Sequence, residues 1–141
     1  MLESPYSGDI DRNIRYLGLI MAESGVVYGE CPYASHACMT QHPRKKDYFV
    51  SDYDAKWNLL DRDQAIARSQ AMRHRADLTV FYTDLGWSKG MLAARGYCEE
   101  HSLAFVERKL DIPGLAKRLP YLTEKFCRAI IYKQPYVAFL D

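Results

Sequence analysis

Residues that could bind a ligand are concentrated between Tyr82 and Met91. The segment follows an apolar run at 78–82 that is typical of a buried strand, and it precedes an Ala-rich run at 91–98 that is typical of a helix. Its useful groups are a carboxylate, two glycines, an indole and a hydroxyl, from Asp84, Gly86, Gly90, Trp87 and Ser88. Glycines allow close approach of the backbone to a ligand, and N–H groups at a helix start attract anions. An ordinary loop with Ser88 as helix N-cap would contain the same residues, so the turn alone leaves both interpretations open.

A second group of candidates lies in the segment from Glu3 to Asp9. Ser7 and Gly8 precede an expected helix and could hold a phosphate or a carboxylate on free N–H groups. The ring of Tyr6, like that of Trp87, could stack on a nucleobase. A plain helix start and a position in the core or at its rim are the ordinary explanations of these residues.

His36 and two carboxylates are the candidates for acid–base chemistry. His36 lies in an expected loop at 31–41, where its imidazole could donate to a ligand or exchange a proton. Asp84 and Glu3 are the carboxylates that we expect to face a pocket, where they could bond ribose hydroxyls or act on a glycosidic bond. The ordinary role of Asp84 would be to orient its own loop. The cysteines and histidines around His36 lack a standard metal spacing, so we expect neither a metal nor another cofactor.

The elements that must position these residues alternate between strands and helices. Strands are expected at 1–3, 26–28, 78–82 and 104–106, and helices from Asp9 or Asp11 to Ser24-Gly25, at 54–75, and from Ser88 to about His101. Apolar strands that alternate with helices indicate a parallel sheet covered by helices. Ligands bind such sheets at the carboxyl ends of the strands, and the segments at 3–9, 30–41 and 83–91 all follow expected strands.

The C-terminal part, at 112–141, is expected to form a helical extension of a main domain at 1–111. Pro113 and Pro120 bracket a short helical piece, and an amphipathic helix is expected from Leu122 to Tyr132. A last strand or a packed tail is expected at 137–140. The extension could cover a sheet edge of its own domain or contact a partner subunit.

Composition limits the classes of function. The 141 residues suffice for one domain, with 48% hydrophobic and 26% charged residues. The net charge of +1 gives no long-range field for DNA, RNA or an anionic membrane, so we expect none of these as a partner. The four cysteines form no CxxC pair, and no apolar run approaches the length of a membrane span. We therefore expect a cytoplasmic protein with reduced thiols.

Three motifs together resemble a known family. They are Glu3-Ser-Pro-Tyr-Ser-Gly-Asp9, Pro32-Tyr-Ala-Ser-His36 and Tyr82-Thr-Asp-Leu-Gly-Trp-Ser-Lys-Gly-Met91. Over about residues 1–108 the chain resembles the nucleoside 2-deoxyribosyltransferase-like superfamily, and within it a small branch found in phages and bacteria. The resemblance implies a flavodoxin-like three-layer sandwich with a parallel sheet of roughly four or five strands. It also implies a homo-oligomer, a dimer or larger, with a pocket for a nucleoside or nucleotide.

Carried over by the resemblance, the ligand-binding residues fall in two groups. The first turn supplies Tyr6, Ser7, Gly8 and Asp9, and the later turn supplies Asp84, Gly86, Ser88 and Gly90. The catalytic Glu of the superfamily falls on Ala94, which can be neither a nucleophile nor a general base.

The replacement at Ala94 favours a protein that binds a nucleotide-like molecule in order to sequester or sense it. The alternative is an N-glycosidase or deoxyribosyltransferase that uses Glu3 or Asp84 as its carboxylate, with His36 as proton donor. A protein-interaction module that kept only the fold is the third interpretation.

Overall fold

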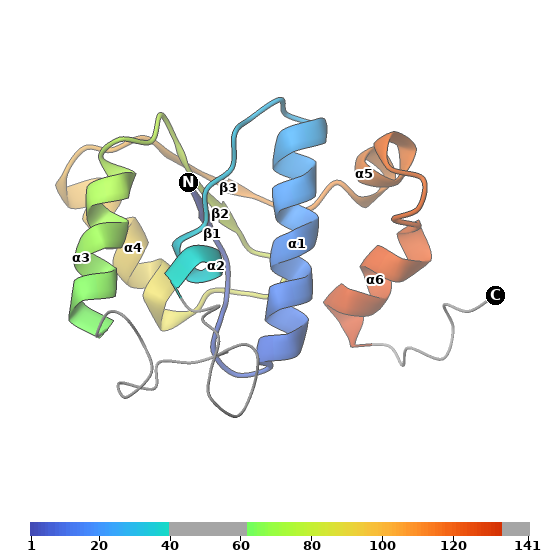
Figure 1. The fold of residues 1–141 in the computed structure, drawn as a ribbon, viewed down its shortest axis with the longest axis horizontal. Coiled ribbons are helices and arrows are strands. Elements are labelled where there is room, and N and C mark those ends of the chain that lie inside the picture. Colours follow the sequence, from blue (N-terminus) through green and yellow to red (C-terminus); the bar gives the residue numbers. More distant parts are fainter. Residues whose placement is uncertain (40–61, 134–141) are drawn as a thin grey trace.

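The computed structural model describes residues 1–39 and 62–133. In these ranges the chain forms three strands and six helices. In chain order they are β1 (Leu2–Glu3), α1 (Ile10–Val26), α2 (Ser35–Met39), α3 (Arg62–Arg73), β2 (Thr79–Tyr82), α4 (Lys89–Glu100), β3 (Phe105–Arg108), α5 (Ile112–Arg118) and α6 (Glu124–Tyr132). Figure 1 shows α1 in front of the strands, with α5 and α6 at one end of the molecule and α3 and α4 at the other.

The strands form one parallel sheet in the order β1-β2-β3, which confirms the predicted mixed α/β class with a parallel sheet. Leu2 pairs with Val80 and Val80 with Val106, so the carboxyl ends of all three strands lie at the same edge. The described ranges contain three strands, against the four or five expected. The N–H of Leu2 also donates to the carbonyl oxygen of Tyr33 at 2.7 Å, so the chain before α2 runs beside the outer edge of β1.

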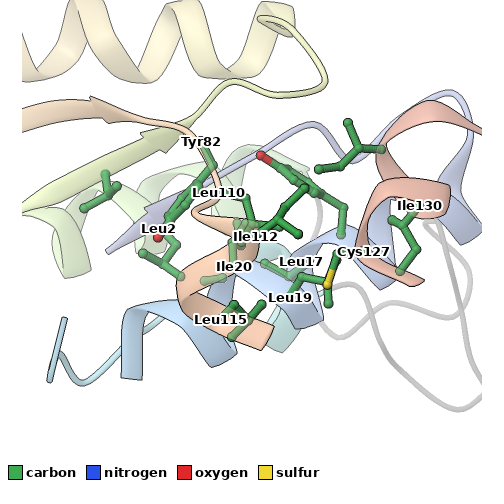
Figure 2. Packing of buried hydrophobic residues seen from close by; sticks show 14 residues of the cluster. Leu2, Leu17, Leu19, Ile20, Tyr82, Leu110, Ile112, Leu115, Cys127 and Ile130 are labelled. Carbon is green, nitrogen blue, oxygen red and sulfur yellow. The ribbon is translucent and has the colours of Figure 1, made fainter. Parts of the chain in front are cut away.

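The central strand β2 is buried throughout because both of its faces are covered. Val80 and Tyr82 belong to a cluster that α1, α5 and α6 complete, and Figure 2 shows its side chains gathered between these elements. Phe81 points to the opposite face, where it packs with Met91, Ala94 and Cys98 of α4. The alternation along β2 therefore places α1 and α4 on opposite faces of the sheet.

The prediction of a strand at 26–28 is wrong, because this segment belongs to the end of α1. Val26 is the last residue of α1, and the N–H groups of Val27 and Tyr28 both donate to the carbonyl oxygen of Glu23. The last turn of the helix is fixed by tertiary contacts, since the Glu23 carboxylate accepts from the hydroxyl of Tyr82 and from the N–H of Asp111. These contacts override the strand preference of two consecutive valines.

The loop expected at 31–41 contains the short helix α2. Ala34 is buried just before this helix, and its carbonyl oxygen accepts from the N–H of Ala37. The other expected helices agree with α1, α3, α4, α5 and α6 to within a few residues, over the part of the chain that the structure describes. The first part of the helix expected at 54–75 and the tail at 137–140 lie outside the described residues.

Candidate functional site

The first loop connects β1 to α1 and is held by the start of that helix. Asp9 is the N-cap, since its carboxylate accepts from the N–H of Arg12, and Gly8 has a φ of +93° that suits glycine. The side-chain amide of Asn13 donates to the carbonyl oxygens of Tyr6 and Ser7, at 2.9 Å each. Ser7, Gly8 and Asp9 are exposed. The loop is thus fixed in shape while its outer surface stays accessible.

The later turn connects β2 to α4 and begins with a tight bend. The N–H of Gly86 donates to the carbonyl oxygen of Thr83 at 3.0 Å, and Gly86 has a φ of +83°. Ser88 is the N-cap of α4, because its hydroxyl accepts from the N–H of Met91 at 3.2 Å. A Cβ at Gly90 would meet only the Ser88 hydroxyl, at 3.8 Å, so the first turn of α4 is open there. The predicted N-cap is therefore confirmed.

Asp84 is anchored through one of its two carboxylate oxygens. Its Oδ2 accepts from the hydroxyl of Tyr16 at 2.5 Å and from the N–H of Leu110 at 3.0 Å. Oδ1 has no hydrogen-bond partner among the residues at 1–39 and 62–133. Burial, and then the hydrogen bond to Asp84, raise the pKa of Tyr16, so its hydroxyl remains a donor at neutral pH. One oxygen of Asp84 therefore anchors the later turn, and the other remains unbonded within the described residues.

Helix α1 fastens both loops. Asn13 and Tyr16 lie three residues apart, on the same side of the helix; Asn13 holds the first loop and Tyr16 holds Asp84 of the later turn. Since β1 and β2 are adjacent parallel strands, their following loops start side by side. Sequence reasoning missed both residues. The available signal was two hydrogen-bonding side chains on the apolar face of an expected helix.

His36 lies beside the first loop. Its Nε2 is 3.1 Å from the hydroxyl oxygen of Ser4, with which it shares a hydrogen bond, and its ring centroid is 6.0 Å from that of Tyr6. Burial lowers the pKa of His36 to about 4. The imidazole is therefore neutral at pH 7 and acts there as a hydrogen-bonding group without charge.

Glu3, the other candidate carboxylate, is bound within the protein. Its Oε1 lies 2.6 Å from a guanidinium nitrogen of Arg73 of α3, and both residues are buried. Burial raises the pKa of Glu3, and the charge of Arg73 acts against that rise. Arg73 also donates to the hydroxyl of Thr79 in β2, so this ion pair joins α3 to the sheet. Glu3 is occupied by this role, and Asp84 is the more accessible of the two carboxylates.

Trp87 and Ala94 belong to the apolar cluster under α4. The Trp87 ring lies 5.2 Å from that of Phe81, and the guanidinium of Arg95 lies 5.6 Å from the Trp87 ring centroid. Ala94 is 5% exposed and packs with Phe81, Met91 and Cys98. Ala94, where the resemblance would place a catalytic Glu, is thus a core residue. Trp87 is half-buried at the edge of the same cluster.

Sequence comparison defines a family for this part of the chain. The family described as "Domain of unknown function (DUF7768)" matches residues 1–108. The chain belongs to the DUF7768 family. No curated protein and no solved structure matches the chain. The DUF7768 region includes both loops, His36 and all three strands, and it ends at the last residue of β3.

A cavity of about 210 Å³ lies at the border of the DUF7768 region. Its lining comes from the start of α1 and the end of α6: Asp9, Asp11, Arg12, Arg15, Ala129, Ile130 and Lys133. Asp9 is the one predicted site residue in this lining. Its neighbours are engaged with each other, since Arg15 pairs with Asp11 and Lys133 with Asp9, each at 3.1 Å. The cavity adjoins the first loop and lies outside the later turn.

The described residues hold no group of three or more metal-ligating side chains. None of the described helices is both long and apolar enough to cross a membrane.

Proposed function

We propose that the protein binds a nucleotide or nucleoside-derived small molecule at the carboxyl ends of β1 and β2. The pocket would lie between the first loop at 4–9, the later turn at 83–88 and His36. This proposal keeps the flavodoxin-like, three-layer architecture and the relation to the nucleoside 2-deoxyribosyltransferase-like superfamily that the motifs suggest. Like the members of that superfamily, the protein would act as a homo-oligomer, which light scattering can check.

The observation that carries the proposal is the bracing of both loops by α1. Asn13 bonds two carbonyl oxygens of the first loop, and Tyr16 bonds Asp84 of the later turn. Each loop is therefore held by bonds to α1, which leave the polar groups on the exposed side of the loop available to a ligand. A preorganised site of this kind avoids much of the entropic cost of ordering loops on binding.

The groups available at this edge suit the parts of a nucleotide. The helices α1 and α4 both start here, and N–H groups in a first helical turn attract phosphate. The free Oδ1 of Asp84 can accept from a ribose hydroxyl. The rings of Tyr6 and neutral His36 offer stacking and hydrogen bonding to a base.

Binding without turnover is the activity that these residues favour. Ala94 offers no carboxylate, and Glu3 is held by Arg73. A protein with such a pocket would sequester or sense its ligand rather than cleave it.

Thermal denaturation against a ligand panel tests the proposal. The panel contains nucleoside monophosphates, cyclic dinucleotides and ADP-ribose derivatives. A ligand at 100 times its Kd stabilises the folded state by about 2.7 kcal/mol, which raises the Tm by roughly 8 °C for a chain of this size. Hits are then measured by calorimetry. Absence of stabilisation by every member would contradict the proposal.

A matched pair of variants locates the site. Asp84→Asn keeps an oxygen that can accept from Tyr16 and Leu110 but removes the charge, and we expect it to weaken ligand binding about tenfold. Asp77→Asn makes the same chemical change at an exposed position outside both loops and should bind as the wild type does. Equal effects of the two substitutions would place the ligand elsewhere.

One observation favours the enzymatic alternative, an N-glycosidase or deoxyribosyltransferase. Asp84 has one oxygen anchored and one free, which is the arrangement of an oriented carboxylate. Prolonged incubation with nucleoside 5′-monophosphates, followed by chromatography, would then release free base with the wild type but not with Asp84→Asn. Unchanged chromatograms for the wild type would exclude this alternative for those substrates.

A further inference from the structure

The segment after the DUF7768 region has a net positive charge, whereas the DUF7768 region has a net negative one. Residues 109–133 contain six basic and two acidic residues, a net charge of +4. Residues 1–108 contain thirteen basic and fifteen acidic residues, a net charge of −2. With −1 from residues 134–141, these parts add up to the net charge of +1 for the whole chain. The expectation of no nucleic-acid partner rests on that total, which hides the difference between the two parts.

Helix α6 carries two of these six basic residues, Lys125 and Arg128, on one side. Its inner side, with Cys127, Ile130 and Ile131, is buried in the main cluster. Lys125, Arg128 and Tyr132 follow at intervals of three and four residues, which places them together on the outer side. Along the helix they span about 10 Å.

Two exposed tyrosines accompany the basic side chains. Tyr121, just before α6, is 75% exposed, and Tyr132, its last residue, is 62% exposed. They are the most exposed large hydrophobic side chains in the described part of the chain. We call Tyr121, Lys125, Arg128, Tyr132 and Lys133 the basic face.

The cations of the basic face remain available to a partner. Arg128 lies 3.7 Å from Glu124 and Lys133 lies 3.1 Å from Asp9, but all four side chains are exposed. Exposed ion pairs contribute little stability, so phosphate groups can replace their carboxylates. Lys125 has no ion-pair partner among the residues that the structure describes.

We propose that the basic face binds single-stranded nucleic acid, with its cations on successive phosphates and its tyrosines stacked on bases. Alternation of basic and aromatic side chains on one surface is what this class of ligand requires. An anionic membrane fits less well, because the apolar side of α6 is turned into the core and cannot insert into lipid. This surface is separate from the proposed nucleotide pocket, and its partner is independent of that proposal.

Fluorescence anisotropy of the full chain with labelled 20-nucleotide oligo-dT and oligo-rU tests this inference. Three phosphate contacts predict a slope of about −2 in log K against log salt, or an affinity about 20-fold lower at 200 mM than at 50 mM salt. Tyr132→Ala should weaken binding about tenfold by removing one stacked base. The double variant Lys125→Gln/Arg128→Gln should bind more weakly and with a salt slope shallower by about 1.4.

A matched double variant shows whether a loss of affinity comes from the basic face itself or only from the change in net charge. Arg68→Gln/Arg75→Gln removes the same charge at exposed positions of the DUF7768 region, and it should retain wild-type affinity and slope. Circular dichroism melts confirm that each variant is folded. Equal losses in the two double variants, absence of binding by the wild type, or binding to phosphatidylserine vesicles but not to the oligonucleotides would each overturn the inference.

Discussion

Removal of the Tyr16 hydroxyl should loosen the later turn and destabilise the fold. In Tyr16→Phe the ring stays in the core, but Asp84 Oδ2 loses a donor at 2.5 Å and keeps only the N–H of Leu110. Hydrogen bonds to charged groups contribute about 1.5–3 kcal/mol. Tyr16 is fully buried whereas Asp84 is half-buried, so water can replace part of the lost bond at the carboxylate. We therefore expect a loss of about 2 kcal/mol, or roughly 6 °C in Tm.

Urea denaturation at pH 7 measures this loss, and a double-mutant cycle assigns it. Asp84→Ala and the double variant Tyr16→Phe/Asp84→Ala complete the cycle, and the pair should show a coupling above about 1 kcal/mol. Tyr97→Phe is the control, because its hydroxyl bonds exposed His74 and should contribute less than about 0.5 kcal/mol. A Tyr16→Phe effect as small as that of the control, or one that persists in full without Asp84, would refute the bracing of the turn by α1.

Three other perturbations test separate parts of the structure. Arg73→Met leaves Glu3 buried without its partner and should lower the free energy of unfolding by about 3–5 kcal/mol at pH 7. Burial raises the pKa of Glu3 above its usual 4.5, so protonation of Glu3 at low pH should make that loss of stability smaller. Urea titrations between pH 7 and 4.5 measure the change. Burial lowers the pKa of His36 from 6.5 to about 4, so the stability that the neutral imidazole gives the fold above pH 6.5 is lost as the pH falls toward 4. His36→Gln should therefore flatten a plot of unfolding free energy against pH between 6.5 and 4. Arg12→Ala removes donors to the carbonyl oxygens of Ile130 and its neighbour at the end of α6, and hydrogen exchange in α6 should accelerate about tenfold or more while β2 stays protected.

Local patterns in the sequence were sufficient to predict most elements. The apolar run before Tyr82 forms β2, and Ser88 caps α4, because burial and capping depend on a few neighbouring residues. The strand predicted at 26–28 was wrong because contacts of Glu23 with Tyr82 and Asp111, far away in the sequence, fix the end of α1. Such contacts leave no signature in local periodicity.

The candidate site was predictable in its location but less so in the roles of its residues. The segments at 3–9 and 83–91 follow adjacent parallel strands and start at one edge, as parallel topology requires. The segment at 30–41 follows α1 instead of a strand, and His36 lies beside the first loop through its hydrogen bond with Ser4. The pairing of Glu3 with Arg73 joins residues 70 positions apart, and the anchor of Asp84 comes from Tyr16, 68 positions away. Nothing in single-sequence spacing reveals partners at such distances. The nucleotide ligand, the oligomer and the cytoplasmic location stay predictions.

The fully buried carboxylate of Glu23 makes the end of the matched family region a poor place to divide the chain. Glu23 accepts from the hydroxyl of Tyr82 inside the DUF7768 region and from the N–H of Asp111 beyond it. A chain truncated after β3 would lose that donor, and the apolar side of α1 would face water where Leu115 and Ile130 now cover it. We therefore expect the two parts to unfold in one cooperative transition.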